Sequence, residues 1–214
     1  MKLNFFTKNI PPRNSALQQK TMPKLVSGFS VVEALVSIGI ITLIMSSVLF
    51  NYSSFNDNLA LSSAGQELAV IVRQAQTYGL TVKEVSSGGG NFNSAYGIYF
   101  DKDDVGNYYL FVDIDGDKKY DSPQELVEKF TFRNGIKVSD LCDELSCPPA
   151  ASVRMMDITF LRPNPDASIN FTNNGGHIVV GPSLTGKIIL VSSRGKTLMV
   201  TIESTGQVLV GQIQ

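Results

Sequence analysis

The sequence has little of the chemistry on which most enzymes depend. Histidine occurs once, at position 177, and the only two cysteines are five positions apart, so a redox CxxC motif is absent. His177 lies in an Asn/Gly-rich turn before a β-branched run, a setting typical of an exposed histidine and not of a general base. Gly88–Gly90 lacks the Lys-Ser/Thr of a phosphate loop. We therefore expect neither enzymatic activity nor a cofactor.

Charge is also unevenly distributed in the N-terminal quarter. Residues 1–28 carry five cations and no acid, whereas Phe29–Phe50 carry one ionisable side chain, that of Glu33. The second stretch is about 22 residues, or roughly 33 Å as a helix, which is enough to span a bilayer. Cations beside a span favour the cytoplasmic side. The sequence thus predicts a single-pass protein of the inner membrane with its C-terminus outside.

A cleaved secretory signal does not fit this pattern. Such a signal has an apolar core of roughly 7–15 residues followed by a small-residue cleavage site. Here the small residue, Gly28, precedes the apolar run. A cut after Gly28 would remove the basic leader and leave the anchor attached.

The stretch Gly28-Phe29-Ser30-Val31-Val32-Glu33 resembles the processing motif of type IV pilins and type II secretion pseudopilins. The resemblance implies cleavage between Gly28 and Phe29 by a prepilin peptidase, N-methylation of Phe29, and a role for Glu33 in assembly. It also implies an inner-membrane assembly platform and other pilin or pseudopilin subunits as partners. The leader is longer than in many pilins, and a start at Met22 instead of Met1 would shorten it.

Glu33 has a physical interpretation beside the resemblance. A carboxylate one turn into an apolar segment is costly in lipid, and pairing with the cationic N-terminus of a neighbouring subunit would offset that cost. The alternative is an ordinary single-pass anchor with a tolerated glutamate near the interface.

The rest of the chain predicts an α+β, pilin-like fold. We expect a cleaved leader over residues 1–28, a transmembrane and polymerisation helix over 29–50, its amphipathic continuation over 51–79, and a β-rich globular domain over 80–214. In the continuation, apolar residues recur at three- and four-residue steps. They are Leu61, Ala64, Leu68, Ile71, Ala75 and Tyr78. Polar residues at 51–58 would allow a kink, and Gly79 suits a C-cap.

After a flexible break at 86–91, short aromatic and β-branched runs between turn residues predict antiparallel hairpins that form a sheet packed against the helix. The predicted strands are 96–100, 108–112, 126–132, 153–161, 169–171, 177–180, 187–191, 197–202 and 207–210.

The acidic hairpin of this domain carries a second resemblance. Leu110–Asp117, Tyr120-Asp121 and Glu125–Val127 resemble the central hairpin of H-type minor pseudopilins and related minor pilins. This resemblance implies a minor subunit that initiates assembly.

The same hairpin raises the question of a metal site. Four carboxylates within nine residues supply the hard oxygen ligands that calcium prefers. They belong to Asp113, Asp115, Asp117 and Asp121. The spacing does not match an EF-hand, because Gly116 stands at position four and Gln124 at position twelve. A hydrogen-bonded acidic turn without metal is the favoured interpretation, with Lys118 and Lys119 offsetting the charge.

Cys142 and Cys147 would lie outside the cytoplasm, where disulfides persist, so we expect a bridge. A zinc site is the alternative, and its remaining ligands would have to include His177.

Binding of DNA for uptake is the competing function class. Related minor pilins bind DNA through a C-terminal Gly-Arg-x-Arg, and this chain has Gly206-Gln207-Val208-Leu209 there, without either arginine. Without the five leader cations, 13 of the 18 basic residues remain against 19 acidic ones, a net charge of about −6. The favoured function is therefore structural, as a subunit of a type IV pilus or a type II secretion pseudopilus, and nucleic acid is not an expected partner.

Overall fold

The computed structural model describes residues 28–81, 94–147 and 153–212. The chain forms two compact units, Met1–Ser46 and Ser47–Gln214, and each is described by itself. One helix, α1 (Val31–Leu80), contributes to both units. The predicted leader over residues 1–28, apart from Gly28, and the predicted break at 86–91 lie outside the described residues.

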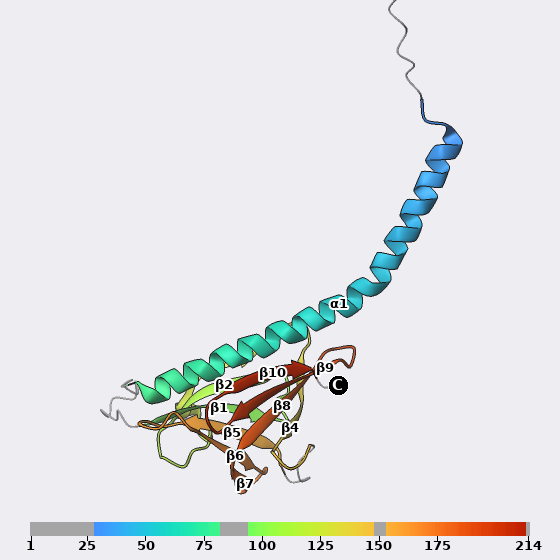
Figure 1. Ribbon diagram of the computed structural model, residues 1–214. Coiled ribbons are helices and arrows are strands. Elements are labelled where there is room, and N and C mark those ends of the chain that lie inside the picture. The colour runs from blue at the N-terminus through green and yellow to red at the C-terminus, as the bar shows by residue number, and fades with distance from the viewer. Residues whose placement is uncertain (1–27, 82–93, 148–152, 213–214) are drawn as a thin grey trace, which may run out of the picture. The chain divides into compact units, whose positions relative to one another are not determined.

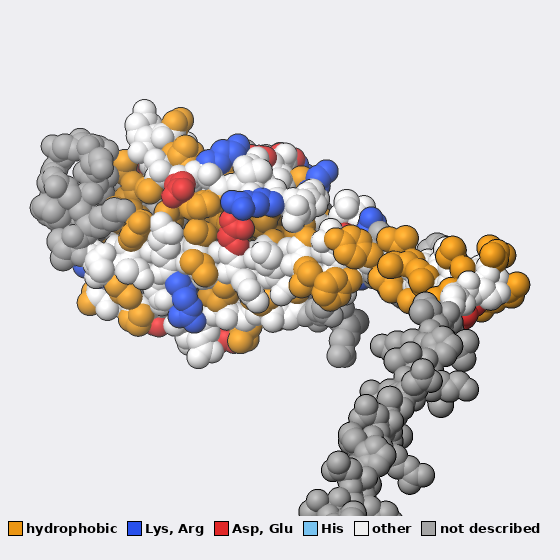
Figure 2. All heavy atoms as spheres, turned by 90° about the horizontal axis from the view of Figure 1, so that it is seen from above, with side chains coloured by type: hydrophobic (Ala, Val, Ile, Leu, Met, Phe, Trp, Pro, Cys, Tyr) orange, Lys and Arg blue, Asp and Glu red, His pale blue; other side chains and the backbone are white. Residues whose placement is uncertain are grey.

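In the first unit α1 is apolar on every side. Val31–Leu49 is long and apolar enough to cross a membrane, and none of it is buried within the protein. Figure 2 shows hydrophobic side chains covering this part of the helix, in contrast to the mixed surface of the globular unit. Its many β-branched residues are mediocre helix formers in water, but a bilayer forces the backbone to satisfy its hydrogen bonds internally. The polar stretch 51–58, whose composition would allow a kink, is continuous helix.

The second unit is an α+β domain with two antiparallel sheets, as Figure 1 shows. The larger sheet has the order β3-β2-β1-β5-β6-β7. Its strands are β1 (Ala95–Asp101), β2 (Asn107–Asp113), β3 (Leu126–Thr131), β5 (Met155–Phe160), β6 (Ala167–Thr172) and β7 (Ile178–Ser183). The smaller sheet has the order β10-β9-β8-β4. Its strands are β4 (Lys137–Cys142), β8 (Thr185–Val191), β9 (Thr197–Glu203) and β10 (Val208–Gln212).

The predicted apolar face of α1 packs into the core. Its buried residues join side chains from both sheets in one cluster, so the helix closes a core that the two sheets share. The helix residues in this cluster are Leu61, Ala64, Leu68, Ile71, Val72 and Ala75.

Two helix glycines permit close contact between α1 and the sheets. A Cβ on Gly65 would lie 2.6 Å from Leu198 Cδ2 of β9, and a Cβ on Gly79 would overlap the carbonyl oxygen of Phe160 in β5. The prediction that Gly79 caps the helix was wrong, because α1 continues to Leu80. Gly79 instead provides the space in which the last turn meets β5.

All nine predicted strands are present, with boundaries shifted by up to three residues. The sequence prediction missed β4 and did not foresee the division into two sheets. In β4 the register shifts between Val138 and Asp140, and the buried Val138 and Leu141 are three residues apart. This irregularity removes the two-residue period by which a half-buried strand is identified.

Candidate functional site

The predicted cleavage position lies just before α1. Residues 28–30 have no regular secondary structure, and the side chain of Phe29 is 82% exposed. Apart from its two chain neighbours, no described residue has an atom within 4 Å of where a Cβ on Gly28 would be. The bond between Gly28 and Phe29 is therefore accessible to another protein.

Glu33 lies in the first turn of α1 with its side chain exposed. The turn is closed by the Ala34 amide, which donates to the Ser30 carbonyl at 3.1 Å, and Ser37 Oγ donates to the carbonyl of Glu33 at 2.7 Å. Among the described residues no cation lies within ion-pair distance of Glu33. The carboxylate is therefore directed outward, where a second molecule can reach it.

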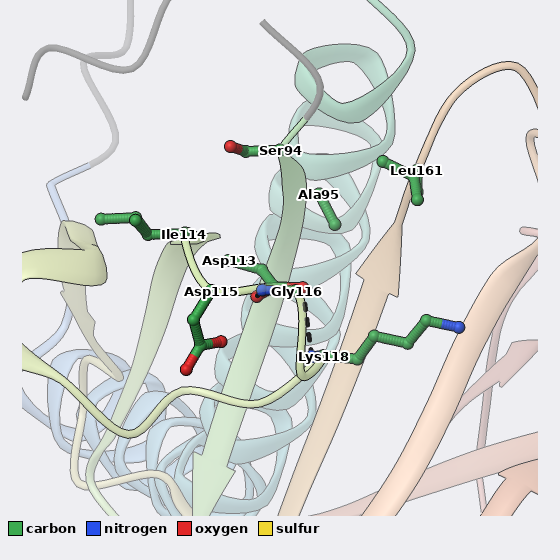
Figure 3. Close-up of a pocket in the computed structure, with 8 residues that line it drawn as sticks. All are labelled: Ser94, Ala95, Asp113, Ile114, Asp115, Gly116, Lys118 and Leu161. Atoms are coloured by element: carbon green, nitrogen blue, oxygen red, sulfur yellow. Dashed lines mark hydrogen bonds between the residues drawn. The ribbon is translucent and has the colours of Figure 1, made fainter. Parts of the chain in front are cut away.

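The acidic loop, residues 113–121, brings three of the four predicted carboxylates together. Carboxylate oxygens of Asp113, Asp115 and Asp117 lie within 4.8 Å of one another, and Asp121 is not part of this group. Asp113 and Asp115 border a cavity of about 250 Å³ between the loop and the start of β1 (Figure 3).

Hydrogen bonds within the loop use these carboxylates. Asp113 accepts from the amides of Gly116 at 2.7 Å and Lys118 at 3.1 Å, and Asp115 accepts from the amide of Asp117 at 3.1 Å. Asp117 accepts from the Lys119 amide and pairs with Lys119 Nζ at 2.6 Å. The Lys118 side chain points away from Asp115 in Figure 3. Lys119 thus offsets part of the negative charge of the loop, as expected. The aspartates accept hydrogen bonds from amides of their own loop, as in an acidic turn without metal.

Two buried carboxyl groups support the loop from below, and sequence analysis did not identify them. Glu125 follows the Ser122-Pro123 start of η1 (Pro123–Glu125) and accepts from the amides of Ile114 and Asp121. Asp157, in the centre of β5 and 1% exposed, accepts from the Tyr120 amide at 3.0 Å. The only available signal for Asp157 was an acid within the apolar run Met155–Phe160.

Burial controls the protonation of these groups. It raises the pKa of Asp157 to about 8, and the nearby charge of Asp117 adds to the effect. Burial also raises the pKa values of Asp113 and Glu125, although hydrogen bonds from backbone amides oppose the shift. The expectation of an acidic turn without calcium stays a prediction.

The predicted disulfide is present. Cys142 and Cys147 are bridged with their Cα atoms 4.8 Å apart. Between them, Asp143 accepts from the amides of Leu145 and Ser146, which holds the short loop closed. Bridged sulfurs are not thiolate ligands, so the zinc alternative has no support. His177 is exposed, and its amide donates to Asn173 Oδ1.

The stretch Gly206–Leu209, at which the sequence lacks the arginines of DNA-binding minor pilins, spans the end of the β9–β10 turn and the start of β10. Gly206 has a φ of 82°, and Leu209 in the edge strand β10 is 54% exposed. An exposed, uncharged strand provides no cation for DNA phosphates.

Comparison of the chain with protein-family models, with curated proteins and with solved structures gave no match. Any functional assignment therefore depends on the residues and the geometry described above.

Proposed function

We propose that this protein is a pilin-like structural subunit, without enzymatic activity, of a type IV pilus or a type II secretion pseudopilus. A prepilin peptidase hydrolyses the bond between Gly28 and Phe29, and the new amine of Phe29 is methylated. The anchored chain then joins a filament through its N-terminal helix. By its acidic hairpin it is a minor, initiating subunit.

One observation carries this proposal: the order of features around residue 28. A basic leader is followed by an accessible Gly28–Phe29 bond, an outward-facing Glu33 and a helix that is apolar on all sides. A simple anchor requires only the last of these. A helix exposed all round can bury its surface first in lipid and later against copies of itself, which suits a subunit that leaves the bilayer.

The test compares Glu33→Gln with the wild type. Glutamine keeps the size and helix propensity but removes the charge, so cleavage should proceed while incorporation into filaments fails. Thr42→Val is the matched control, because Thr42 Oγ1 donates to the Gly39 carbonyl of its own helix and has no other hydrogen bond among the described residues. Mass spectrometry should find N-methyl-Phe29 in all three proteins. An intact leader in filaments would contradict the family assignment, and normal incorporation of Glu33→Gln would show that Glu33 is a tolerated acid without a role in assembly.

A further inference from the structure

One end of the globular unit gathers two turns against the beginning of its helix. Lys137 at the start of β4 pairs in register with Val191 at the end of β8, so the β3–β4 turn (132–136) lies beside the β8–β9 turn (192–196). Arg194 reaches Asp57 of α1 at 3.3 Å, and Lys196 Nζ reaches Asn58 Oδ1 at 3.0 Å. We call this surface the basic end.

The ion pairs at the basic end leave an excess of positive charge. The nearby acids Asp57, Asp103, Asp104 and Asp140 are each matched by a cation, namely Arg194, Arg154, Lys129 and Lys102. Asp101 accepts from the hydroxyl of Tyr99. Arg133 and Lys137 are exposed, and no carboxylate of the described residues lies within ion-pair distance of either.

A hollow of about 350 Å³ opens at this end. Its lining holds one carboxylate and one guanidinium, Asp57 and Arg194, which pair with each other, so the excess positive charge lies outside the hollow, on Arg133 and Lys137. The ring of Tyr52 also lines it. Tyr52 and Phe55 are 65% and 61% exposed. Exposed aromatic rings beside cations are typical of the bilayer interface.

In the sequence, the helix residues of the basic end follow the apolar segment after only a few positions. Tyr52 follows Leu49, the last residue of the candidate span, by three residues, and α1 is continuous between them. At the helical rise, Tyr52 is about 5 Å and Asp57 about 12 Å along the helix from Leu49. If Val31–Leu49 lies in a bilayer, the basic end is within reach of the headgroups.

We propose that the basic end docks on anionic phospholipid headgroups of the bilayer that holds the anchor. Arg133 and Lys137 face the surface charge, and the exposed rings of Tyr52 and Phe55 lie at the level of the headgroups. The inference rests on the membrane anchoring in the proposed function but not on cleavage or filament assembly. Each cation near an anionic surface favours the docked state about five-fold, so removing both should weaken docking about 25-fold.

The chain contains no tryptophan, so one introduced tryptophan reports its own position. Full-length Ser193→Trp, in the 192–196 turn, is reconstituted into vesicles that contain a quencher attached to a small fraction of headgroups. Leu145→Trp is the control at the other end of β4, where the native leucine is 89% exposed. We expect strong quenching at position 193 in phosphatidylglycerol vesicles, weak quenching in phosphatidylcholine vesicles, and weak quenching at position 145 in both. High salt should reduce the difference.

A matched pair of charge variants tests the surface. Arg133→Gln with Lys137→Gln should abolish the extra quenching in anionic vesicles. Lys118→Gln with Lys187→Gln also removes two positive charges, but from the opposite end of the globular unit, and should leave the extra quenching unchanged. Equal quenching in both lipids, or equal loss in both double variants, would overturn the proposal.

Inorganic phosphate is tested in neutral vesicles. Phosphate could raise the melting temperature of the wild type but not of the Arg133/Lys137 double variant, while quenching is the same in anionic and neutral vesicles. In that case the surface binds free anions and the proposal fails.

Failure of docking and failure of the proposed function are separable. Flotation with both vesicle types first establishes that the anchor is inserted. A chain that floats but shows no charge-dependent quenching refutes the docking surface and leaves the pilin-like assignment intact. A chain that does not float contradicts the membrane anchor, on which both proposals depend.

Discussion

Replacing the buried Asp157 by asparagine should make the protein more stable above neutral pH. Asp157 is 1% exposed beneath the acidic loop, and burial raises the pKa of its carboxyl from 3.8 to about 8. In the folded protein it is therefore neutral at pH 7, and asparagine has nearly the same shape as the protonated acid. Asparagine Oδ1 can still accept the hydrogen bond that the Tyr120 amide donates to Asp157 Oδ1 at 3.0 Å.

The sign follows from proton binding. Between pH 3.8 and about 8 the folded state keeps a proton that the unfolded state loses. The stabilisation that comes from this bound proton is fully present below the unfolded-state pKa of 3.8, and it is lost as the pH rises through the folded-state pKa of about 8. Each pKa unit is worth about 1.4 kcal/mol, so the ceiling on this loss is about 6 kcal/mol.

Local opening of the acidic loop should limit the measured loss to about 1–3 kcal/mol. Above pH 8 the chain can lift residues 114–122 and hydrate the carboxylate at lower cost than global unfolding. The pKa values of Asp113 and Glu125 are also raised, so their contributions to the free energy of unfolding also fall as the pH rises. The lowered pKa of Asp104 acts oppositely, because its contribution is lost only in acid. Some slope should therefore persist in Asp157→Asn.

Urea unfolding in detergent at pH 5, 7 and 9, followed by near-ultraviolet circular dichroism, measures this effect. The rings of Tyr99, Tyr109 and Tyr120 lie 5.1–5.8 Å apart and supply the signal. Hydrogen exchange at the Tyr120 amide should quicken with pH in the wild type beyond the intrinsic rate, but not in Asp157→Asn. Asp121→Asn, an exposed carboxylate in the same loop, is the control. Identical pH slopes for the wild type and Asp157→Asn would refute the reasoning.

Three further outcomes can be checked on the same protein. Reduction of the Cys142–Cys147 bridge should lower stability by about 2 kcal/mol on the chain-entropy model, and an unchanged melt with free thiols would contradict this. Calcium should not raise the melting temperature, and a rise abolished by Asp115→Ala would show that the loop binds the ion. Gly79→Ala should cost about 1–3 kcal/mol because its Cβ overlaps a backbone carbonyl, whereas Gly106→Ala, with nothing within 4 Å, should be near neutral.

Periodic parts of the fold could be predicted from the sequence. Leu61, Ala64, Leu68 and Ala75 follow the helical repeat, and all are buried. The strand β9 alternates buried and half-buried residues from Thr197 to Glu203, as its sequence suggests. In these segments local preference and tertiary packing agree, and such agreement makes a pattern informative.

Parts that depend on distant contacts could not be predicted in this way. Asp157 has no sequence neighbour that accounts for it, since its cover comes from Tyr120, 37 residues earlier. The pairing of Arg194 with Asp57 joins groups 137 residues apart. A helix-ending glycine and a close-packed glycine also look alike in sequence, so the role of Gly79 depended on the position of β5.

The charges around residue 28 are consistent with the proposed cleavage. Before cleavage, the five leader cations lie outside the apolar stretch, the last of them at Lys24. The proposed cleavage would remove them all and place one amine on Phe29, four residues from Glu33 and on the same apolar segment. The helix N-terminus favours a carboxylate by about 0.3–1 kcal/mol at an exposed position, whereas an unpaired charge in lipid costs about 2.5 kcal/mol or more. The helix dipole alone does not offset a cost of the size found at the centre of a membrane helix, and a cation from the chain itself or from a neighbour would reduce what remains. The proposed cleavage would create such a cation at the end of the apolar segment, and it would also remove the leader charges that hold this end of the chain on the cytoplasmic side.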